Sequence, residues 1–150
     1  METHDQAEGR PAGARRAGLT VSPSAARQWL AFSAAAYGLA AVLLAAVGAH
    51  SVSFATAADA GLWHTALEIH LFHAVAMLAV AALPSKDYHP ALPYSGLALG
   101  LGTLLFSGSL YLRASGIDLL PGWLAPGGGL VLMAAWLWLA LAHLPGRSHP

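Results

Sequence analysis

Long apolar stretches alternate with short polar segments along this chain. Four stretches consist almost wholly of apolar side chains, at residues 29–50, 62–83, 92–112 and 124–144. An α-helix rises about 1.5 Å per residue, so about 20 residues cover the ~30 Å hydrocarbon core of a bilayer. Strands that cross a membrane are about half as long and alternate in polarity, which these stretches do not. The pattern therefore predicts four transmembrane helices.

The segments between the stretches are short. Consecutive helices must run antiparallel as neighbours because the connections between them, at residues 51–61, 84–91 and 113–123, are short. We therefore predict an all-α fold, an integral membrane four-helix bundle with up-down-up-down topology. The membrane domain covers residues 27–146 and is followed by a short tail at 147–150.

Composition narrows the class of protein. Apolar residues make up 57 % of the chain and charged residues 9 %, against roughly 25 % charged residues in soluble domains. Seven basic residues balance seven acidic ones, so no net field attracts nucleic acid. The absence of cysteine excludes disulfides, thiolate metal sites and thiol catalysis. Residues 1–26 differ, with charged residues among Ala, Gly, Pro and Ser, and predict a flexible N-terminal arm.

Basic residues near helix ends indicate orientation, because cytoplasmic loops carry an excess of Lys and Arg. Six of the seven lie on one side of the predicted bundle, and only Arg113 lies on the other. We therefore expect both termini, and with them the arm, in the cytoplasm. The lipid bilayer is the predicted partner, and a homo-oligomer or a further membrane partner is left open. The six residues are Arg10, Arg15, Arg16, Arg27, Lys86 and Arg147.

A cleaved signal peptide is the alternative interpretation of the first stretch. Arg15 and Arg16 precede an apolar run, and the sequence Ala55-Thr56-Ala57 beyond it imitates a cleavage site. The run is longer than the apolar region of about 7–15 residues in a signal peptide, so we prefer four spans. Cleavage would leave three spans and place the N-terminus outside.

Small residues recur at helical spacing in two of the stretches. Membrane helices associate by close packing, since lipid tails are as apolar as leucine, and small residues let two backbones approach. Packing within the chain is the preferred interpretation, and homodimerisation is the alternative. The residues are Ala34, Gly38, Ala41, Ala45 and Gly48 in the first stretch and Gly96, Gly100, Thr103 and Ser107 in the third.

Polar side chains collect in the outer half of the predicted bundle, away from the expected cytoplasmic face. Glu68 is the only acidic residue well inside a span, about 10 Å from the outer boundary, and His73 lies about 18 Å deep. Ionisable groups inside a membrane are costly, so each needs a partner or a function. The hypothesised site for a ligand or a proton consists of Glu68, His73, Ser107, Ser109, Tyr111 and His50.

Helical spacing divides the ionisable side chains of the second stretch between two faces. His64 shares a face with Glu68, and His70 shares another with His73, so at least two neighbouring helices must meet them. Three interpretations stay open. The polar groups form hydrogen bonds that fix helix packing, or they bind a small ligand or proton, or they hold a metal or haem.

No motif of a known catalytic class is present. A hydrolase elbow, a phosphate-binding loop, a dinucleotide fingerprint and an HExxH zinc motif are all absent from the sequence. We therefore expect a protein without enzymatic activity, bound metal or cofactor. The alternatives are a proton-coupled small transporter or accessory subunit that uses Glu68 and His73, and a haem- or quinone-binding redox protein.

Four motifs occur in an order that resembles one known family. VGAH at 47–50 ends the first stretch, and WHTALEIHLFHAVA at 63–76 runs along the second. LFSGSLY at 105–111 ends the third stretch, and PGGG at 126–129 opens the fourth. Together they resemble the small membrane proteins of the "domain of unknown function 423" family, which includes a vertebrate transmembrane protein of the same size. The resemblance covers about residues 29–144.

The resemblance implies a four-span protein of the bacterial inner (plasma) membrane, with no established activity. His70 stands where relatives often have glutamine, and Ala125 and Gly127 replace a threonine and an isoleucine at the usual entry to the fourth span. Further matches to motif positions imply structural roles. They are Gly48, Phe106, Gly108, Pro126, Gly128 and Gly129.

Overall fold

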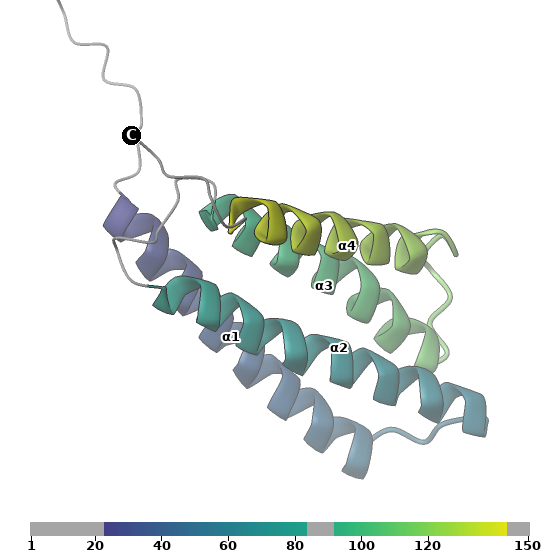
Figure 1. The fold of residues 1–150 in the computed structure, drawn as a ribbon. Helices are drawn as coiled ribbons and strands as arrows, with labels where there is room; N and C mark the ends of the chain where they lie inside the picture. The colour runs from purple at the N-terminus through teal and green to yellow at the C-terminus, as the bar shows by residue number, and fades with distance from the viewer. Residues whose placement is uncertain (1–22, 84–91, 144–150) are drawn as a thin grey trace, which may run out of the picture.

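The computed structural model describes residues 23–83 and 92–143, and within them the chain forms four α-helices and no strand (Figure 1). Each helix is long and apolar enough to cross a bilayer. The predicted all-α fold with four membrane-spanning helices is confirmed. The helices are α1 (Pro23–His50), α2 (Ala57–Ala82), α3 (Leu92–Ala114) and α4 (Leu124–Ala142).

Helix α1 begins inside the segment predicted as an arm. Its first residue is Pro23, and proline suits the first helical position because its missing N–H would have no helical partner there. Residues 23–26 therefore belong to a helix. The rest of the arm, the connection at 84–91 and the tail lie outside the described residues.

Helix α2 begins at Ala57, five residues before the predicted span. Thr56 and Asp59 form a capping box. The Asp59 N–H donates to Thr56 Oγ1 at 3.1 Å, and the Thr56 N–H donates to Asp59 Oδ2 at 3.0 Å. These bonds satisfy N–H groups that the first turn leaves unpaired, and the Asp59 carboxylate suits the positive end of the helix dipole. Local polar chemistry therefore extends this helix beyond its apolar stretch.

Helix α3 ends at Ala114 in a tight cap. The Ile117 N–H donates to the Leu112 carbonyl at 2.9 Å, and the Gly116 N–H donates to the Arg113 carbonyl at 3.0 Å. This pair of bonds is a Schellman motif, which requires a left-handed residue just after the helix. Gly116, with φ 76°, supplies that conformation.

The helices form an open arrangement in which α2 and α3 lie at the centre. Helix α1 packs against α2 and α3, and α4 packs against α3. Figure 1 shows α1 beside α2 and α4 beside α3. Among the described residues, no Cα atom of α1 lies within 8 Å of one in α4. The four helices therefore do not form a closed ring.

Glycine permits a close contact between α3 and α4. A Cβ on Gly128 would lie 2.5 Å from the Phe106 nitrogen and 2.9 Å from the Gly102 carbonyl oxygen. Gly48 serves α1 and α2 similarly, since a Cβ there would overlap the Trp63 indole. Several of the predicted small residues are buried within the chain, which favours intramolecular packing. They are Ala34, Ala41, Gly96, Gly100, Thr103 and Ser107.

Large apolar side chains cover the outer surface of the helices. Leu39, Val42 and Leu137 are each about 60 % exposed, which would be costly in water but suits contact with lipid. The core holds small residues and a few large ones, among them Met77 and Leu99. Buried polar residues stand out against this background and locate the candidate site.

Candidate functional site

A cavity of about 270 Å³ lies where α1, α2 and α3 meet. Helix α2 contributes the side chain of His70, which is 8 % exposed. Because the other walls are mostly apolar, His70 and the few hydroxyl groups beside it are the features that can orient a ligand. The lining residues are Tyr37, Ala40, Leu44, His70, Thr103, Leu104, Ser107, Gly108 and Tyr111.

Two tyrosines hold His70 in place. The Tyr111 hydroxyl lies 3.4 Å from His70 Nδ1, and the Tyr37 ring meets the imidazole edge-on with centroids 5.4 Å apart. The Tyr37 hydroxyl donates to the Gly100 carbonyl at 3.0 Å, which ties α1 to α3. Trp63 packs against Tyr111 with centroids 4.8 Å apart. The imidazole therefore sits in a frame supplied by three helices.

Two buried polar atoms of this cavity have no hydrogen-bond partner. They are Nε2 of His70 and Oγ of Ser107, and Ser107 is only 1 % exposed. Thr103 differs, because its hydroxyl donates to the Leu99 carbonyl at 2.7 Å. Buried polar groups in native proteins nearly always have a partner, so these two atoms are the ones at this cavity with unused hydrogen-bonding capacity.

The neutral imidazole can present either hydrogen-bonding role to the cavity. If the Tyr111 hydroxyl donates to Nδ1, then Nε2 carries the proton and is a donor. If Nδ1–H donates to the hydroxyl instead, Nε2 is an acceptor. The Ser107 hydroxyl can also donate or accept. The pair is therefore chemically adaptable.

His73 lies in a different contact, on the side of α2 that meets α4. Its Nδ1 is 2.7 Å from the Ile69 carbonyl, so this nitrogen is the N–H donor. Its Nε2 accepts from the indole N–H of Trp136 at 3.1 Å. Phe72 packs against both rings. Because both nitrogens are engaged, this histidine has no lone pair free for a metal, a haem or a substrate.

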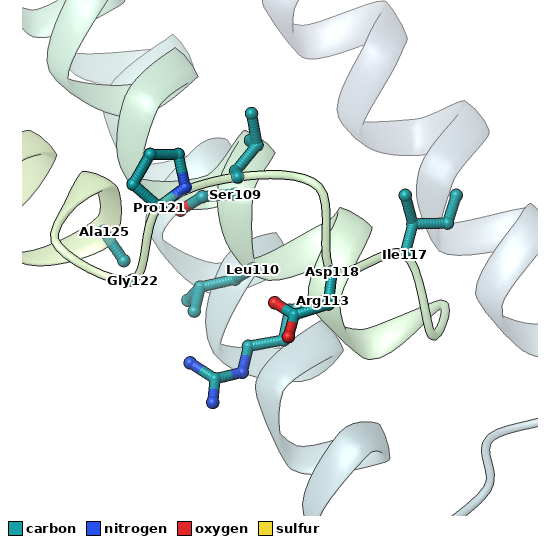
Figure 2. A pocket seen from close by; sticks show the side chains of 9 residues that line it. Ser109, Leu110, Arg113, Ile117, Asp118, Pro121, Gly122 and Ala125 are labelled. Atoms are coloured by element: carbon teal, nitrogen blue, oxygen red, sulfur yellow. The ribbon is translucent and has the colours of Figure 1, made fainter.

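Ser109 faces a second, much smaller cavity next to the α3–α4 connection. Its hydroxyl donates to the Phe106 carbonyl at 2.8 Å. Figure 2 shows Arg113 and Asp118 among the other residues that line this pocket, whose volume of about 30 Å³ has room for one water. This small pocket and the His70 cavity have no lining residue in common.

Glu68 and His50 are exposed on the isolated chain. The structure thus brings Ser107 and Tyr111 to one cavity, and it places the other four hypothesised residues elsewhere. Among the described residues, no hydrogen bond joins any two of the six hypothesised residues. The six are Glu68, His73, Ser107, Ser109, Tyr111 and His50.

Sequence reasoning left His70 and Tyr37 out of the site. A signal for His70 was present, because Trp63, Ala66 and His70 recur at helical spacing on the buried side of α2. Tyr37 carried no such signal, since a lone tyrosine in an apolar helix is typical of packing. In the part of the chain that the structure describes, no group of three His, Cys, Asp or Glu residues is arranged to hold a metal ion.

Comparison with known proteins identifies the family of this chain. The model of the family described as "Protein of unknown function (DUF423)" matches residues 44–129. The chain belongs to this family. The matched segment includes most residues of the His70 cavity, namely Leu44 on α1, His70 on α2 and the five α3 residues Thr103, Leu104, Ser107, Gly108 and Tyr111.

Bacterial membrane proteins are among the relatives of this DUF423 chain. The UPF0382 membrane protein of Haemophilus influenzae is 38 % identical over 109 residues, which is 71 % of this chain and 86 % of that protein. The UPF0382 inner membrane protein YgdD of Escherichia coli is 38 % identical over 104 residues, covering 69 % and 79 %. The UPF0382 membrane protein YwdK of Bacillus subtilis is 35 % identical over 108 residues, covering 69 % and 86 %. No solved structure matches the chain.

The relatives and the helices agree on the class of protein. The relatives are membrane proteins, the Escherichia coli one of the inner membrane, and their names state no reaction. The chain is therefore a multi-pass membrane protein of the DUF423 family, with the lipid bilayer as its surroundings.

Proposed function

We propose that this protein is a non-enzymatic membrane protein that holds one small lipophilic molecule, with a hydrogen-bonding head, in the cavity at His70. The observation that carries the proposal is the pair of unpaired buried atoms, His70 Nε2 and Ser107 Oγ, in a single cavity. Leaving such a group unpaired costs about 1–3 kcal/mol. A ligand head that bonds both atoms recovers this free energy.

The surroundings of the cavity suit entry from the bilayer. Leu104 lines it and is 61 % exposed, so the α1–α3 side of the cavity reaches the lipid-facing surface. The volume of about 270 Å³ is slightly below the range of about 300–1,000 Å³ that is typical of ligand pockets. It therefore suits the ring or head of a ligand whose apolar tail remains in lipid.

The dual role of the histidine favours a quinone as one class of ligand. A quinone carbonyl accepts a hydrogen bond and a hydroquinone hydroxyl donates one, and the two tautomers of His70 match the two cases. Glu68 and His73 are not part of this proposal, because Glu68 is exposed and His73 has both ring nitrogens hydrogen-bonded. Among the described residues, no hydrogen bond joins Glu68 to His73 in support of proton coupling through that pair.

Equilibrium binding of decylubiquinone to the purified protein tests the proposal. Trp63 packs against Tyr111 at the cavity, so quenching of tryptophan fluorescence reports occupancy. We expect saturable binding that His70→Phe and Ser107→Ala each weaken by about two- to tenfold, the equivalent of one net hydrogen bond.

Two control variants distinguish loss of the binding site from a general effect of substitution on binding. His64→Phe removes an exposed histidine from the same helix, and Ser33→Ala removes a serine whose hydroxyl bonds the Trp29 carbonyl. Both are expected to bind the probe like the original chain. Equal affinity in all four variants, or the absence of saturable binding, would overturn the proposal.

A further inference from the structure

A third cavity, also of about 270 Å³, lies between α3 and α4, towards the end of the bundle where α3 begins. It is separate from the His70 cavity and shares no lining residue with it. Small and apolar side chains form its floor, and two aromatic rings lie at its edge. The lining residues are Tyr94, Ser95, Ala98, Val131, Ala134, Ala135 and Trp138.

One buried hydroxyl in this cavity has no partner. Ser95 is 2 % exposed, and its Oγ makes no hydrogen bond. A serine in a helix can bond a carbonyl three or four residues earlier, such as that of Leu92 for Ser95, but the Ser95 hydroxyl makes no such bond here. The hydroxyl is therefore an available donor at the wall of an apolar groove.

The depth of Ser95 identifies the layer of the bilayer that it meets. It lies about 4.5 Å inside the start of α3, a helix about 35 Å long. This level is close to the edge of the ~30 Å hydrocarbon core, where acyl chains join the glycerol of a phospholipid through ester groups. Tyr94 and Trp138 are 71 % and 54 % exposed, and such rings favour the same interfacial layer.

We propose that this groove binds one acyl chain of a diacyl phospholipid from the leaflet at the α3 N-terminus. The Ser95 hydroxyl donates to the ester carbonyl of that chain. The first methylenes of the chain lie over Ala98 and Ala134, and the rings of Tyr94 and Trp138 flank the glycerol. The proposal is independent of the function proposed for the His70 cavity.

A lipid fits this groove better than a second copy of the chain. An ester carbonyl of a phospholipid is an acceptor at the depth of Ser95. The small side chains Ala98, Ala134 and Ala135 also leave space for a flexible chain.

Competition between two lipids tests the proposal on the full-length protein. The protein is exchanged into equimolar dipalmitoyl phosphatidylethanolamine and its dihexadecyl ether analogue, which lacks the ester carbonyls, and the retained lipid is measured by native mass spectrometry. We expect the ester lipid to be retained in excess by about two- to tenfold, the equivalent of one hydrogen bond. Ser95→Ala is expected to reduce this ratio to about one, while Ser33→Ala preserves it.

A second variant distinguishes a lipid from a second copy of the chain as the occupant of the groove. Ala134→Trp fills the groove and is expected to reduce retention of both lipids without changing the oligomeric state. A ratio of one in the original protein, or an excess that Ser95→Ala leaves intact, would overturn the proposal. Conversion of a dimer into a monomer by Ala134→Trp would also overturn it, because a second copy would then be the occupant.

Discussion

At the scale of single residues, two histidines three positions apart in α2 have opposite surroundings. His73 bonds through both ring nitrogens, to Ile69 and Trp136, so its tautomer is set. His70 has a long contact of 3.4 Å from Nδ1 to the Tyr111 hydroxyl, the Tyr37 backbone lies close to its ring, and its Nε2 is buried without a hydrogen-bond partner. The first arrangement stabilises helix packing, and the second leaves an atom free for a ligand. Residue type alone does not distinguish these roles.

The difference between the two histidines leads to a prediction. Trp136→Phe removes the bond to His73 and should lower the free energy of unfolding by about 0.6 kcal/mol, the average for hydrogen bonds between membrane helices. Unfolding by titration with a denaturing detergent measures this change. Affinity for decylubiquinone should not change, whereas His70→Phe should weaken it. Loss of probe binding in Trp136→Phe would show that the two histidines act together.

At the scale of elements, helix ends and helix contacts depend on a few polar or small residues. The capping box of Thr56 and Asp59 starts α2, and Gly116 completes the end of α3. Gly128 lets α4 approach the backbone of α3. The capping box and Gly116 lie outside the apolar stretches, and hydrophobicity does not distinguish Gly128 within the fourth stretch. The apolar stretches therefore located the helices but not their ends or this close contact.

Removal of the N-cap should destabilise α2. Thr56→Ala loses the hydroxyl that accepts from the Asp59 N–H and should lower the free energy of unfolding by about 1 kcal/mol. Detergent-induced unfolding followed by circular dichroism measures the loss. Thr65→Ala changes an exposed threonine within the same helix and should have a smaller effect. Equal losses in the two variants would contradict a capping role.

The contact at Gly128 should not tolerate a methyl group. Gly128→Ala places a carbon 2.5 Å from the Phe106 nitrogen, which belongs to the backbone and can move only with α3. Overpacking of this kind costs about 1–3 kcal/mol. Gly38→Ala is the control, because a Cβ there meets nothing within 4 Å and should be neutral or stabilise the helix. The same unfolding experiment compares the two.

At the scale of the whole molecule, the helices leave both proposed sites open to lipid. Helix α1 lies against α2 and α3, and α4 lies against α3, with no contact between the backbones of α1 and α4 in the described residues. Because the arrangement does not close, the grooves on either side of α3 reach the bilayer directly. A closed ring of four helices would have sealed them, so both binding proposals depend on this topology.

Orientation in the membrane is a further prediction at this scale. The sequence predicts six of the seven basic residues on the side of the termini, so we expect both termini in the cytoplasm. A green fluorescent protein fused after Pro150 should fluoresce, and alkaline phosphatase fused there should be inactive. Phosphatase inserted after Asp118, in the α3–α4 connection, should be active. The reverse pattern would contradict the expected orientation.

By itself, the sequence determined that this is a membrane protein with four helical spans, and its motifs indicated the DUF423 family. Both conclusions rest on hydrophobicity and on the order of short motifs, which are properties of residues close together in the sequence. Only the tertiary structure decided which polar groups share a cavity. Ser107 and Tyr111 were predicted and do line it, but His70 and Tyr37 complete it, and Glu68 is exposed. The physical reason is that the direction a side chain faces depends on how helices pack, and this packing is set by contacts such as Gly128 with Phe106 that join distant residues.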